Sequence, residues 1–436
     1  MNVRRLTSLL IAAMALLCAT PAAAQLRIEI NRGVSEAVPV AVVPFGYDGP
    51  GQAPIDAADV IAGDLGRSGR FAPLPADDMI SRPSSAREVN FTDWRLLKTD
   101  FLVIGSLLDQ GGDRYLIRFQ VFDVFRGSQV LGFQIPAGAD ALRAAAHRAA
   151  DMIFEKLTGT PGAFSTRIAY VSVTQQGEKD LYRLFVADAD GANPRMIAES
   201  SQPLMSPGWS PDGRRLAYVS FEGNRSAIFV QELATGQRTE VSARPGINGA
   251  PAFSPDGRWL ALTLSGRDGN LDIHVLNPAT GQLRRLTKNP AIDTEAAWSA
   301  DGKSIYFTSD RSGGPQVYMV PADGSGGARR ITFEGRYNAR PRVTPDGASL
   351  AVVHNDQGNY RIALVDLETK STRILTDGRQ DESPSMAPNG SMIIYATRLA
   401  GRGTLAAVST DGRISQTLAA AAGDVREPVW SPYPTY

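Results

Sequence analysis

The feature that most constrains this chain is a short turn phrase that recurs six times in its second half. The copies begin at Trp209, Phe253, Trp298, Val343, Met386 and Trp430, and most continue as Ser-Pro-Asp-Gly or a close variant. Successive copies begin 44, 45, 45, 43 and 44 residues apart. A period of this length is typical of four-stranded propeller blades arranged in a ring. The repeats therefore predict an all-β propeller of six blades.

Each copy has the composition of a tight turn between antiparallel strands. Proline presets φ at the second position of a type I turn, aspartate tolerates the third, and glycine suits the fourth. An apolar run follows each turn, as at residues 216–220. Two further strand-like runs, separated by turns rich in Gly, Asn or Asp, complete the period. Each period therefore supplies the four strands of one blade.

The first and last repeats are incomplete in complementary ways. Residues 167–197 contain three strand-like runs but lack the aromatic-Ser-Pro strand, which occurs instead at residues 427–431. Pairing these two pieces would remove the unpaired sheet edges of an open ring. We therefore predict that the C-terminal strand completes blade one and closes a propeller spanning residues 165–436.

The start of the chain has the features of a secretory signal. Arg4 and Arg5 precede an apolar run at residues 9–17, and an Ala-x-Ala cleavage site ends at Ala24. The apolar run is too short to span a bilayer. We therefore expect residues 1–24 to be removed and the mature chain to be a periplasmic protein that is peripheral to the membranes.

Composition limits the partners of the mature chain. The single cysteine, Cys18, lies in the predicted signal, so the mature chain can form no disulfide, and a periplasmic protein with a sizeable core needs none. Loss of Arg4 and Arg5 lowers the basic residues from 45 to 43 against 45 acidic residues, a net charge of −2. This charge argues against nucleic acid as a partner. We expect a monomer.

Residues 25–160 carry no repeat and mix strand-like and helical patterns. Apolar runs predict strands at residues 26–30, 38–45, 101–107, 115–124 and 130–135. Apolar side chains at residues 142, 145, 149, 153 and 157 share one face of a helix predicted over residues 139–157. These patterns predict a small α/β domain at residues 25–160, followed by a short linker.

Catalytic and metal-binding motifs are scarce. The histidines His147, His274 and His354 lack metal-ligand spacing, and the chain has no Gly-x-Ser-x-Gly elbow or phosphate-binding glycine loop. Asp188-Ala189-Asp190-Gly191 is similar to the start of a calcium loop, but it lacks the distal glutamate and falls in phase with the turns of other blades. We therefore assign no catalytic residue, metal ligand or cofactor.

One set of equivalent positions departs from the regularity of the repeat. The segments just before the lead residues should begin the innermost strands and surround one mouth of the central channel. Variation on a symmetric scaffold is typical of a binding face, although solvated loops without a role would vary too. These segments are residues 204–206, 248–250, 293–295, 338–340, 381–383 and 425–427.

Phrases outside the turn repeat carry a resemblance to a known family. They are residues 25–33, 40–45, 155–164 and 166–170, together with residues 248–257 of the second copy. On these phrases the whole mature chain resembles the TolB family, the periplasmic components of the Tol-Pal system. The resemblance implies a non-enzymatic scaffold that supports outer-membrane integrity and constriction at cell division.

The resemblance also implies two protein partners. Family members bind the lipoprotein Pal through the propeller mouth and the C-terminal domain of TolA through the mature N-terminus. The Pal-binding residues implied here, with neighbouring positions of the mouth, are Met205, Asn248, Gly249, Ala250, Thr294, Glu295, Arg340, Glu382 and Glu427, and Ile247 stands where a histidine is expected. The TolA-binding residues are Gln25, Leu26, Arg27, Ile28, Glu29, Ile30, Asn31, Arg32 and Gly33.

The N-terminal segment is patterned as a strand. Leu26, Ile28 and Ile30 alternate with Arg27 and Glu29, which gives the segment one apolar and one polar face. Such a strand can add to a sheet edge of a partner or lie back on its own domain. If both states are populated, binding at the propeller and binding at the N-terminus would be coupled.

A second class of function stays open on the sequence alone. A six-bladed propeller can hold a hydrolase site, such as that of a calcium-dependent lactonase, or can bind a peptide or a sugar in its channel. Either role needs acidic, amide and histidine side chains that converge on the axis. Glu295, Asp381 and Glu382 could supply part of such a cluster, but no histidine accompanies them.

Overall fold

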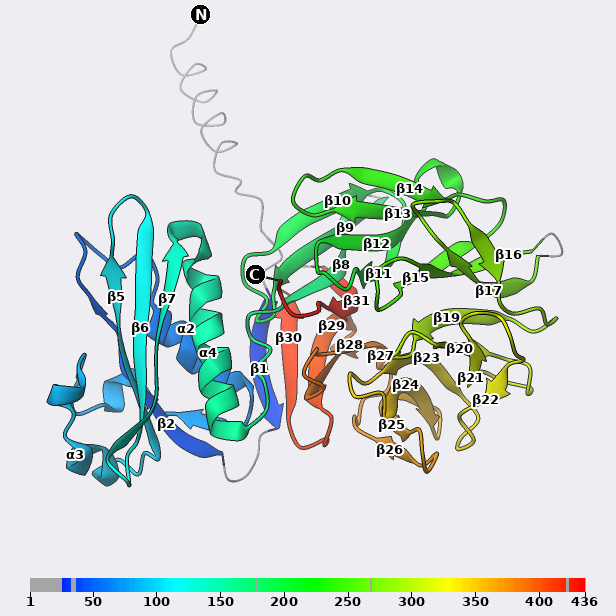
Figure 1. The fold of residues 1–436 in the computed structure, drawn as a ribbon. Coiled ribbons are helices and arrows are strands. Elements are labelled where there is room, and N and C mark those ends of the chain that lie inside the picture. The colour runs from blue at the N-terminus through cyan, green and yellow to red at the C-terminus, as the bar shows by residue number, and fades with distance from the viewer. Residues whose placement is uncertain (1–25, 33–36, 178, 267–268, 421–422, 436) are drawn as a thin grey trace, which may run out of the picture.

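The computed structural model describes residues 26–32, 37–177, 179–266, 269–420 and 423–435. The predicted signal at residues 1–24, Gln25 and Gly33 lie outside these ranges. The described chain forms an α/β domain followed by a six-bladed propeller, which confirms the predicted fold class (Figure 1).

The N-terminal domain is built on one mixed sheet with the strand order β4-β2-β5-β6-β7, and β3 also pairs with β5. Pairing is parallel among β2, β3, β4 and β5 and antiparallel through β6 and β7. The strands are β2 (Val38–Val42), β3 (Gly46–Tyr47), β4 (Phe71–Pro73), β5 (Phe101–Asp109), β6 (Arg114–Asp123) and β7 (Ser128–Gly138). The predicted strands are therefore present, together with the short strands β3 and β4, for which no prediction was made.

Helices cover both faces of this sheet. Helices α2 (Ala57–Arg67) and α4 (Leu142–Thr158) pack on one face with a shared apolar core, and the short α3 (Phe91–Leu96) buries Trp94 on the other. Three single 3-10 turns, η1 (Ala76–Asp78), η2 (Ala86–Glu88) and η3 (Ala139–Ala141), lie between the larger elements. Figure 1 shows α4 between the sheet and the propeller, so one side of this helix faces its own sheet and the other faces the propeller.

Helix α4 agrees with the helix predicted over residues 139–157. Its apolar residues recur at helical spacing, and Leu142, Ala149 and Ile153 are buried in the core. The helix ends at Gly159, whose φ of 76° is left-handed, and the Gly159 N–H donates to the carbonyl of Glu155.

The propeller consists of six four-stranded antiparallel blades. Blade one contains β8 (Arg167–Gln176), β9 (Lys179–Asp188), β10 (Arg195–Ser200) and β31 (Asp424–Trp430). Blade two contains β11 (Leu204–Trp209), β12 (Arg215–Ser220), β13 (Ala227–Glu232) and β14 (Arg238–Ser242), with the turn η4 (Glu222–Asn224). Blade three contains β15 (Asn248–Phe253), β16 (Leu260–Ser265), β17 (Leu271–Leu276) and β18 (Leu283–Arg285).

The remaining blades follow the same order. Blade four contains β19 (Asp293–Trp298), β20 (Ser304–Ser309), β21 (Gln316–Pro321) and β22 (Arg329–Arg330). Blade five contains β23 (Asn338–Val343), β24 (Ser349–Asp356), β25 (Asn359–Asp366) and β26 (Thr372–Ile374). Blade six contains β27 (Glu382–Met386), β28 (Met392–Leu399), β29 (Arg402–Ser409) and β30 (Ser415–Ala420). An apolar cluster fills the seam between each pair of neighbouring blades, which distributes the propeller core around the ring.

The repeated turn phrase has the same hydrogen bonds in successive blades. In the first copy the Gly213 N–H donates to the Ser210 carbonyl, and the Ser210 hydroxyl accepts from the Arg215 N–H at 2.9 Å. The lead tryptophans fix neighbouring blades to each other, since the Trp209 indole donates to the Val429 carbonyl and the Trp298 indole to the Ala252 carbonyl. These tryptophans are structural.

The C-terminal strand closes the ring as predicted. Strand β31 pairs antiparallel with β8, with Val425 opposite Ser172 and Trp430 opposite Ile168. The Trp430 indole donates to the Thr166 hydroxyl at 2.8 Å. Blade one is therefore assembled from residues that lie at opposite ends of the propeller sequence.

The N-terminal strand β1 (Leu26–Arg32) does not lie on its own domain. It pairs antiparallel with β30, with Leu26 opposite Ala420 and Ile30 opposite Gln416, and so becomes a fifth strand of blade six. Figure 1 shows it between the two domains. Docking on the N-terminal domain was the alternative expected from the sequence, and the structure places the strand on the propeller instead. None of the described helices is long and apolar enough to cross a membrane.

Candidate functional site: the mouth of the propeller channel

Every innermost strand carries the same irregularity near its start. The pairing register of each shifts after one of its first three residues, as at a β-bulge, and one residue there adopts a left-handed φ between 46° and 57°. Non-glycine residues in this region cost about 1–3 kcal/mol each, so six such positions require strong support from their surroundings. We call these six residues the channel ring: Ser206, Ala250, Glu295, Arg340, Ser383 and Glu427.

The residues two positions before the channel ring supply part of that support. Asn248 is 0% exposed, and its side-chain oxygen accepts from the Ser242 hydroxyl and the Arg244 N–H. Its amide nitrogen donates to the carbonyls of Ser226 and Arg244. In blade four the corresponding Asp293 is also buried and accepts two hydrogen bonds from Arg311, each 2.8 Å long. These buried, hydrogen-bonded side chains therefore fix the start of the inner strands that form the mouth.

Polar contacts link five members of the channel ring across five blades. The Glu295 carboxylate accepts from Arg340 Nε at 2.7 Å and from the Arg340 N–H at 3.1 Å. Arg340 also donates to the Ser383 hydroxyl and lies 3.6 Å from Glu427, whose carboxylate accepts from the Ser206 N–H. Only Ala250 has no side chain able to join this network.

The carboxylates determine the electrostatics of the ring. Burial would lower the pKa of Arg340, but Glu295 and Glu427 outweigh this effect and raise its pKa. Burial and the charge of Arg340 together lower the pKa of Arg342, which lies two residues further along β23. The channel therefore holds the guanidinium groups of Arg340 and Arg342 close to two carboxylates, and Arg340 contacts both of them.

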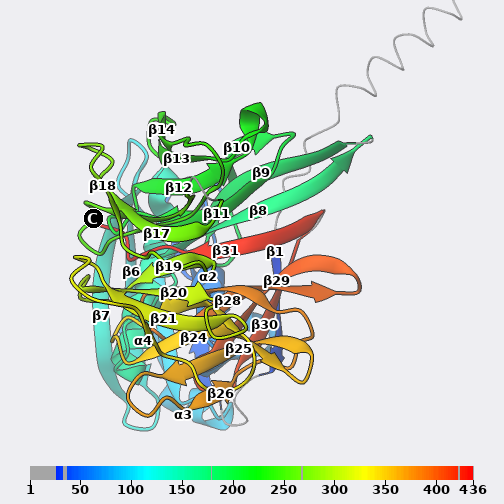
Figure 2. The ribbon, with the colours of Figure 1, turned by 90° about the vertical axis from the view of Figure 1, so that its right-hand side faces the viewer.

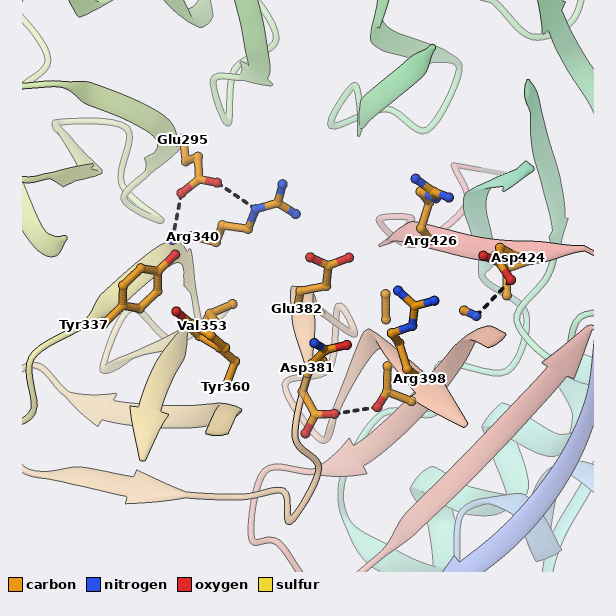
Figure 3. Close-up of a pocket in the computed structure, with 15 residues that line it drawn as sticks. Glu295, Tyr337, Arg340, Val353, Tyr360, Asp381, Glu382, Arg398, Asp424 and Arg426 are labelled. Atoms are coloured by element: carbon orange, nitrogen blue, oxygen red, sulfur yellow. Dashed lines mark hydrogen bonds and ion pairs between the residues drawn. The ribbon is translucent and has the colours of Figure 1, made fainter. Parts of the chain in front are cut away.

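A cavity of about 540 Å³ opens above this network. It is lined by Glu295, Tyr337, Arg340, Tyr360, Asp381, Glu382, Arg398, Asp424 and Arg426, among others. Figure 3 shows the Glu382 carboxylate between Arg340 on one side and Arg398 and Arg426 on the other. Glu382 is exposed to solvent, whereas Asp381 is buried and accepts from the Thr397 hydroxyl at 2.6 Å.

Aromatic side chains line the cavity, and exposed apolar side chains precede two of the inner strands. Ile247 and Ile292, which precede β15 and β19, are 45% and 47% exposed. Tyr337 precedes β23 and contacts Tyr360 edge to face, with ring centroids 5.2 Å apart. A concave charged surface, with aromatic groups in its lining and exposed apolar groups before the inner strands, is suited to binding a protein surface.

The structure divides the residues predicted for this mouth into four groups. Glu295, Arg340 and Glu382 line the cavity, and Ala250 and Glu427 lie deeper in the channel. Thr294 contacts the Thr263 hydroxyl at 3.2 Å, and Gly249 is paired with the same Thr263. Asn248 and Met205 do not line the cavity, because Asn248 is buried in its hydrogen-bond network and Met205 packs against the core between blades two and three.

Several residues that line the cavity were not predicted from the sequence. Tyr360 and Arg398 belong to the hairpins β24–β25 and β28–β29, whose strands are eight residues long where the corresponding strands of blades two to four have six. Figure 2 shows the β28–β29 hairpin extending from one face of the propeller. The apolar runs of these blades are of similar length to those of blades two to four, so the apolar pattern does not mark the extra strand length that moves the hairpin tip toward the mouth.

Two of the three acidic residues considered for a catalytic cluster are already engaged. Glu295 contacts Arg340 and Thr308, and Asp381 accepts from Thr376 and Thr397. No histidine is found among the described residues that line the cavity. One group of the described residues has side chains close enough to hold a metal ion, namely His147, Asp188 and Asp190, and it lies at the domain interface rather than in the mouth.

Comparison with known proteins shows similarity along nearly the whole chain. Residues 26–130 match the family described as the TolB amino-terminal domain, and residues 154–434 match the TolB beta propeller domain. The Tol-Pal system protein TolB of Thioalkalivibrio sulfidiphilus is 56% identical over 422 residues, which is 96% of this chain and 97% of that protein. The protein of the same name from Nitrosococcus oceani is 57% identical over 413 residues, 94% of each chain. The crystal structure of TolB from Acinetobacter baumannii superposes with a TM-score of 0.86 at 39% identity and covers 94% of this chain and 100% of that one.

Proposed function

The chain belongs to the TolB family of the Tol-Pal system, and from this premise we propose that it is a non-enzymatic periplasmic scaffold with two protein partners. It binds Pal through the mouth of its propeller and the C-terminal domain of TolA through its N-terminal segment. In this role it supports outer-membrane integrity and constriction during cell division.

The observation that carries the proposal for Pal is the charged and preorganised mouth. The channel ring is fixed by contacts across five blades, so binding there needs little ordering of the backbone. Glu382, Arg398 and Arg426 present both signs of charge around a cavity of about 540 Å³. Such a surface favours a partner with complementary charges and a protruding segment that enters the cavity.

The docked position of β1 supports the proposal for TolA. Strand β1 is the edge strand of blade six, and its outer edge pairs with no other strand in the described parts of the chain. An edge strand offers a row of backbone donors and acceptors to another sheet. TolA can therefore add to β1 where it lies, or can pair with the segment after it leaves β30.

Two of the three acidic residues considered for a catalytic site are engaged in contacts, which supports a scaffold over a hydrolase. A general base must be free to accept a proton from its substrate. Glu295 is paired with Arg340, and Asp381 accepts two hydroxyl hydrogen bonds. Binding, rather than proton transfer, is the chemistry that these side chains are arranged to perform.

The mouth is tested by reversing one exposed charge. We expect Glu382→Arg to weaken binding of the soluble domain of Pal by about tenfold, because it places a third positive side chain beside Arg398 and Arg426. The matched control is Glu368→Arg, which reverses an exposed charge in the turn between β25 and β26. Affinities are measured by calorimetry, and circular dichroism checks that both variants melt like the unaltered chain. Equal affinity of the two variants for Pal would place the interface elsewhere.

A further inference from the structure

A second cluster of charged groups lies between the two domains, at the opposite ends of the blade-one strands from the mouth. It joins α2 and α4 of the N-terminal domain to the turn that follows β9. We call it the interdomain cluster, and its members are Asp64 and Arg67 of α2, Arg143 and His147 of α4, and Asp188 and Asp190 of blade one.

His147 is one of two members of this cluster with a buried nitrogen that lacks a hydrogen-bond partner, and Arg143 is the other. The His147 side chain is 2% exposed, and its Nδ1 lies 2.7 Å from a carboxylate oxygen of the fully buried Asp64. Its Nε2 is buried and has no hydrogen-bond partner in the described parts of the chain. The nearest acceptors are carboxylate oxygens of Asp190 at 3.8 Å and Asp188 at 4.0 Å. A buried nitrogen without a partner is destabilising, so this arrangement requires a compensating interaction.

The protonation state of His147 follows from these neighbours. An ionised carboxylate only accepts hydrogen bonds, so Nδ1 carries a proton and donates a hydrogen bond to Asp64. A neutral imidazole would then direct the Nε2 lone pair toward two carboxylates, which is repulsive. An imidazolium directs an N–H there instead and attracts both Asp188 and Asp190 across the domain boundary.

The count of charges in the cluster agrees with this assignment. With its three carboxylates ionised against two guanidinium groups, the cluster is neutral when His147 carries the third positive charge. Asp190 already contacts Arg143 directly and lies 3.7 Å from Arg67. A divalent cation would add two charges beside these guanidinium groups, whereas one proton balances the cluster without displacing either of them.

We propose that His147 is a proton-operated clamp between the two domains. Its imidazolium form ties α4 to the Asp188 and Asp190 carboxylates of blade one, and its neutral form weakens that tie. The clamp is independent of the proposed partners, because it rests on contacts within this chain.

The direction of the titration supports the clamp. Burial would lower the pKa of His147, but the hydrogen bond and charge of Asp64, with the charges of Asp190 and Asp188, raise this pKa above its usual 6.5. Burial raises the pKa of Asp64 too, while its contacts with His147 and Arg67 oppose that rise. Because the pKa of His147 is raised in the folded state, its stabilisation is complete below about pH 6.5 and is lost as the pH rises through the folded value.

The chain contains its own controls for a measurement of this titration. His274 and His354 are the other two histidines, and burial lowers the pKa of each. In the intact chain labelled with 15N-histidine, we expect one imidazole to titrate above pH 6.5 and the other two below it. Loss of the high-pH signal in His147→Gln assigns it.

The interdomain tie is tested from the propeller side. Asp190→Asn should lower the titration midpoint of His147 by about one pH unit, since it removes one of the facing charges. Asp180→Asn, an exposed change in β9 of the same blade, should leave the midpoint unchanged. Linkage is reciprocal, so a midpoint that depends on Asp190 means that protonation of His147 strengthens the contact with Asp190.

Thermal melting provides the second readout. We expect the unaltered chain to lose more thermal stability than His147→Gln does when the pH is raised from 6 to 8.5. A His147 midpoint at or below 6.5, or one that Asp190→Asn does not move, would overturn the clamp. Saturable Zn²⁺ binding that His147→Gln abolishes would also overturn it and would assign the cluster to a metal instead.

Discussion

At the scale of single residues, neighbouring positions of the repeat have different tasks. In blade three, Asn248 is buried and hydrogen-bonded, while Ala250, two residues later, has a left-handed φ and faces the channel. The same division recurs in blade four between Asp293 and Glu295. The bulge in each inner strand separates the supporting residue from the exposed one, which alternation along a regular strand could not do.

This division of tasks predicts that two alanine substitutions at the mouth differ in their effect on stability. Asn248→Ala leaves the Ser242 hydroxyl and the Arg244 N–H without their acceptor, and we expect it to lower the free energy of unfolding by roughly 2–3 kcal/mol. Glu382→Ala changes an exposed side chain and should leave stability within about 0.5 kcal/mol of the unaltered chain. Denaturant unfolding measures both. Equal stability of the two variants would contradict the supporting role of Asn248.

The sequence predicted where the mouth lies but not which way each side chain faces. The period places Glu295 and Arg340 at equivalent positions of neighbouring blades, and the structure brings them into direct contact. The left-handed bulges are not visible in the sequence, because none of the six positions is a glycine.

The interdomain cluster was missed for a different reason. His147 and Asp64 are 83 residues apart, and no local pattern marks two helices that each place charged side chains at a domain boundary.

At the scale of elements, both ends of the chain are held by pairing with distant strands. The C-terminal β31 completes blade one, and the N-terminal β1 extends blade six. The sequence predicted the first pairing because the repeat left a gap that only one segment could fill. It could not predict the second, because blade six already has four strands and nothing in the repeat calls for a fifth.

Closure of the ring predicts a large effect of removing the last strand. Truncation after Asp424 removes most of β31, exposes the edge of β8, and eliminates the Trp430 contact with Thr166. We expect this truncation to lower the melting temperature sharply or to cause aggregation. Truncation after Pro432 keeps β31 and serves as the control. A melting temperature shared by both truncations would be incompatible with a ring closed by β31.

At the scale of the whole molecule, the two domains meet at two kinds of contact. The interdomain cluster joins α2 and α4 to blade one, and the side chain of Gln416 on β30 donates to the carbonyl of Arg67 at the end of α2. Strand β30 also carries β1, so Arg67 contacts the strand that holds the proposed TolA-binding segment. The proposed Pal site lies at the other end of the propeller channel. A scaffold of this form can hold two partners at separate places on one chain.

The most direct test of the two-partner scaffold is calorimetry on the chain that starts at Gln25 and on a truncation that starts at residue 34. Each is titrated with the soluble domain of Pal and with the C-terminal domain of TolA. The truncation removes β1 but none of the cavity-lining residues. We predict that it loses TolA binding and still binds Pal with a folded propeller. Retained TolA binding by the truncation would contradict the account, as would Pal binding that disappears while the propeller stays folded.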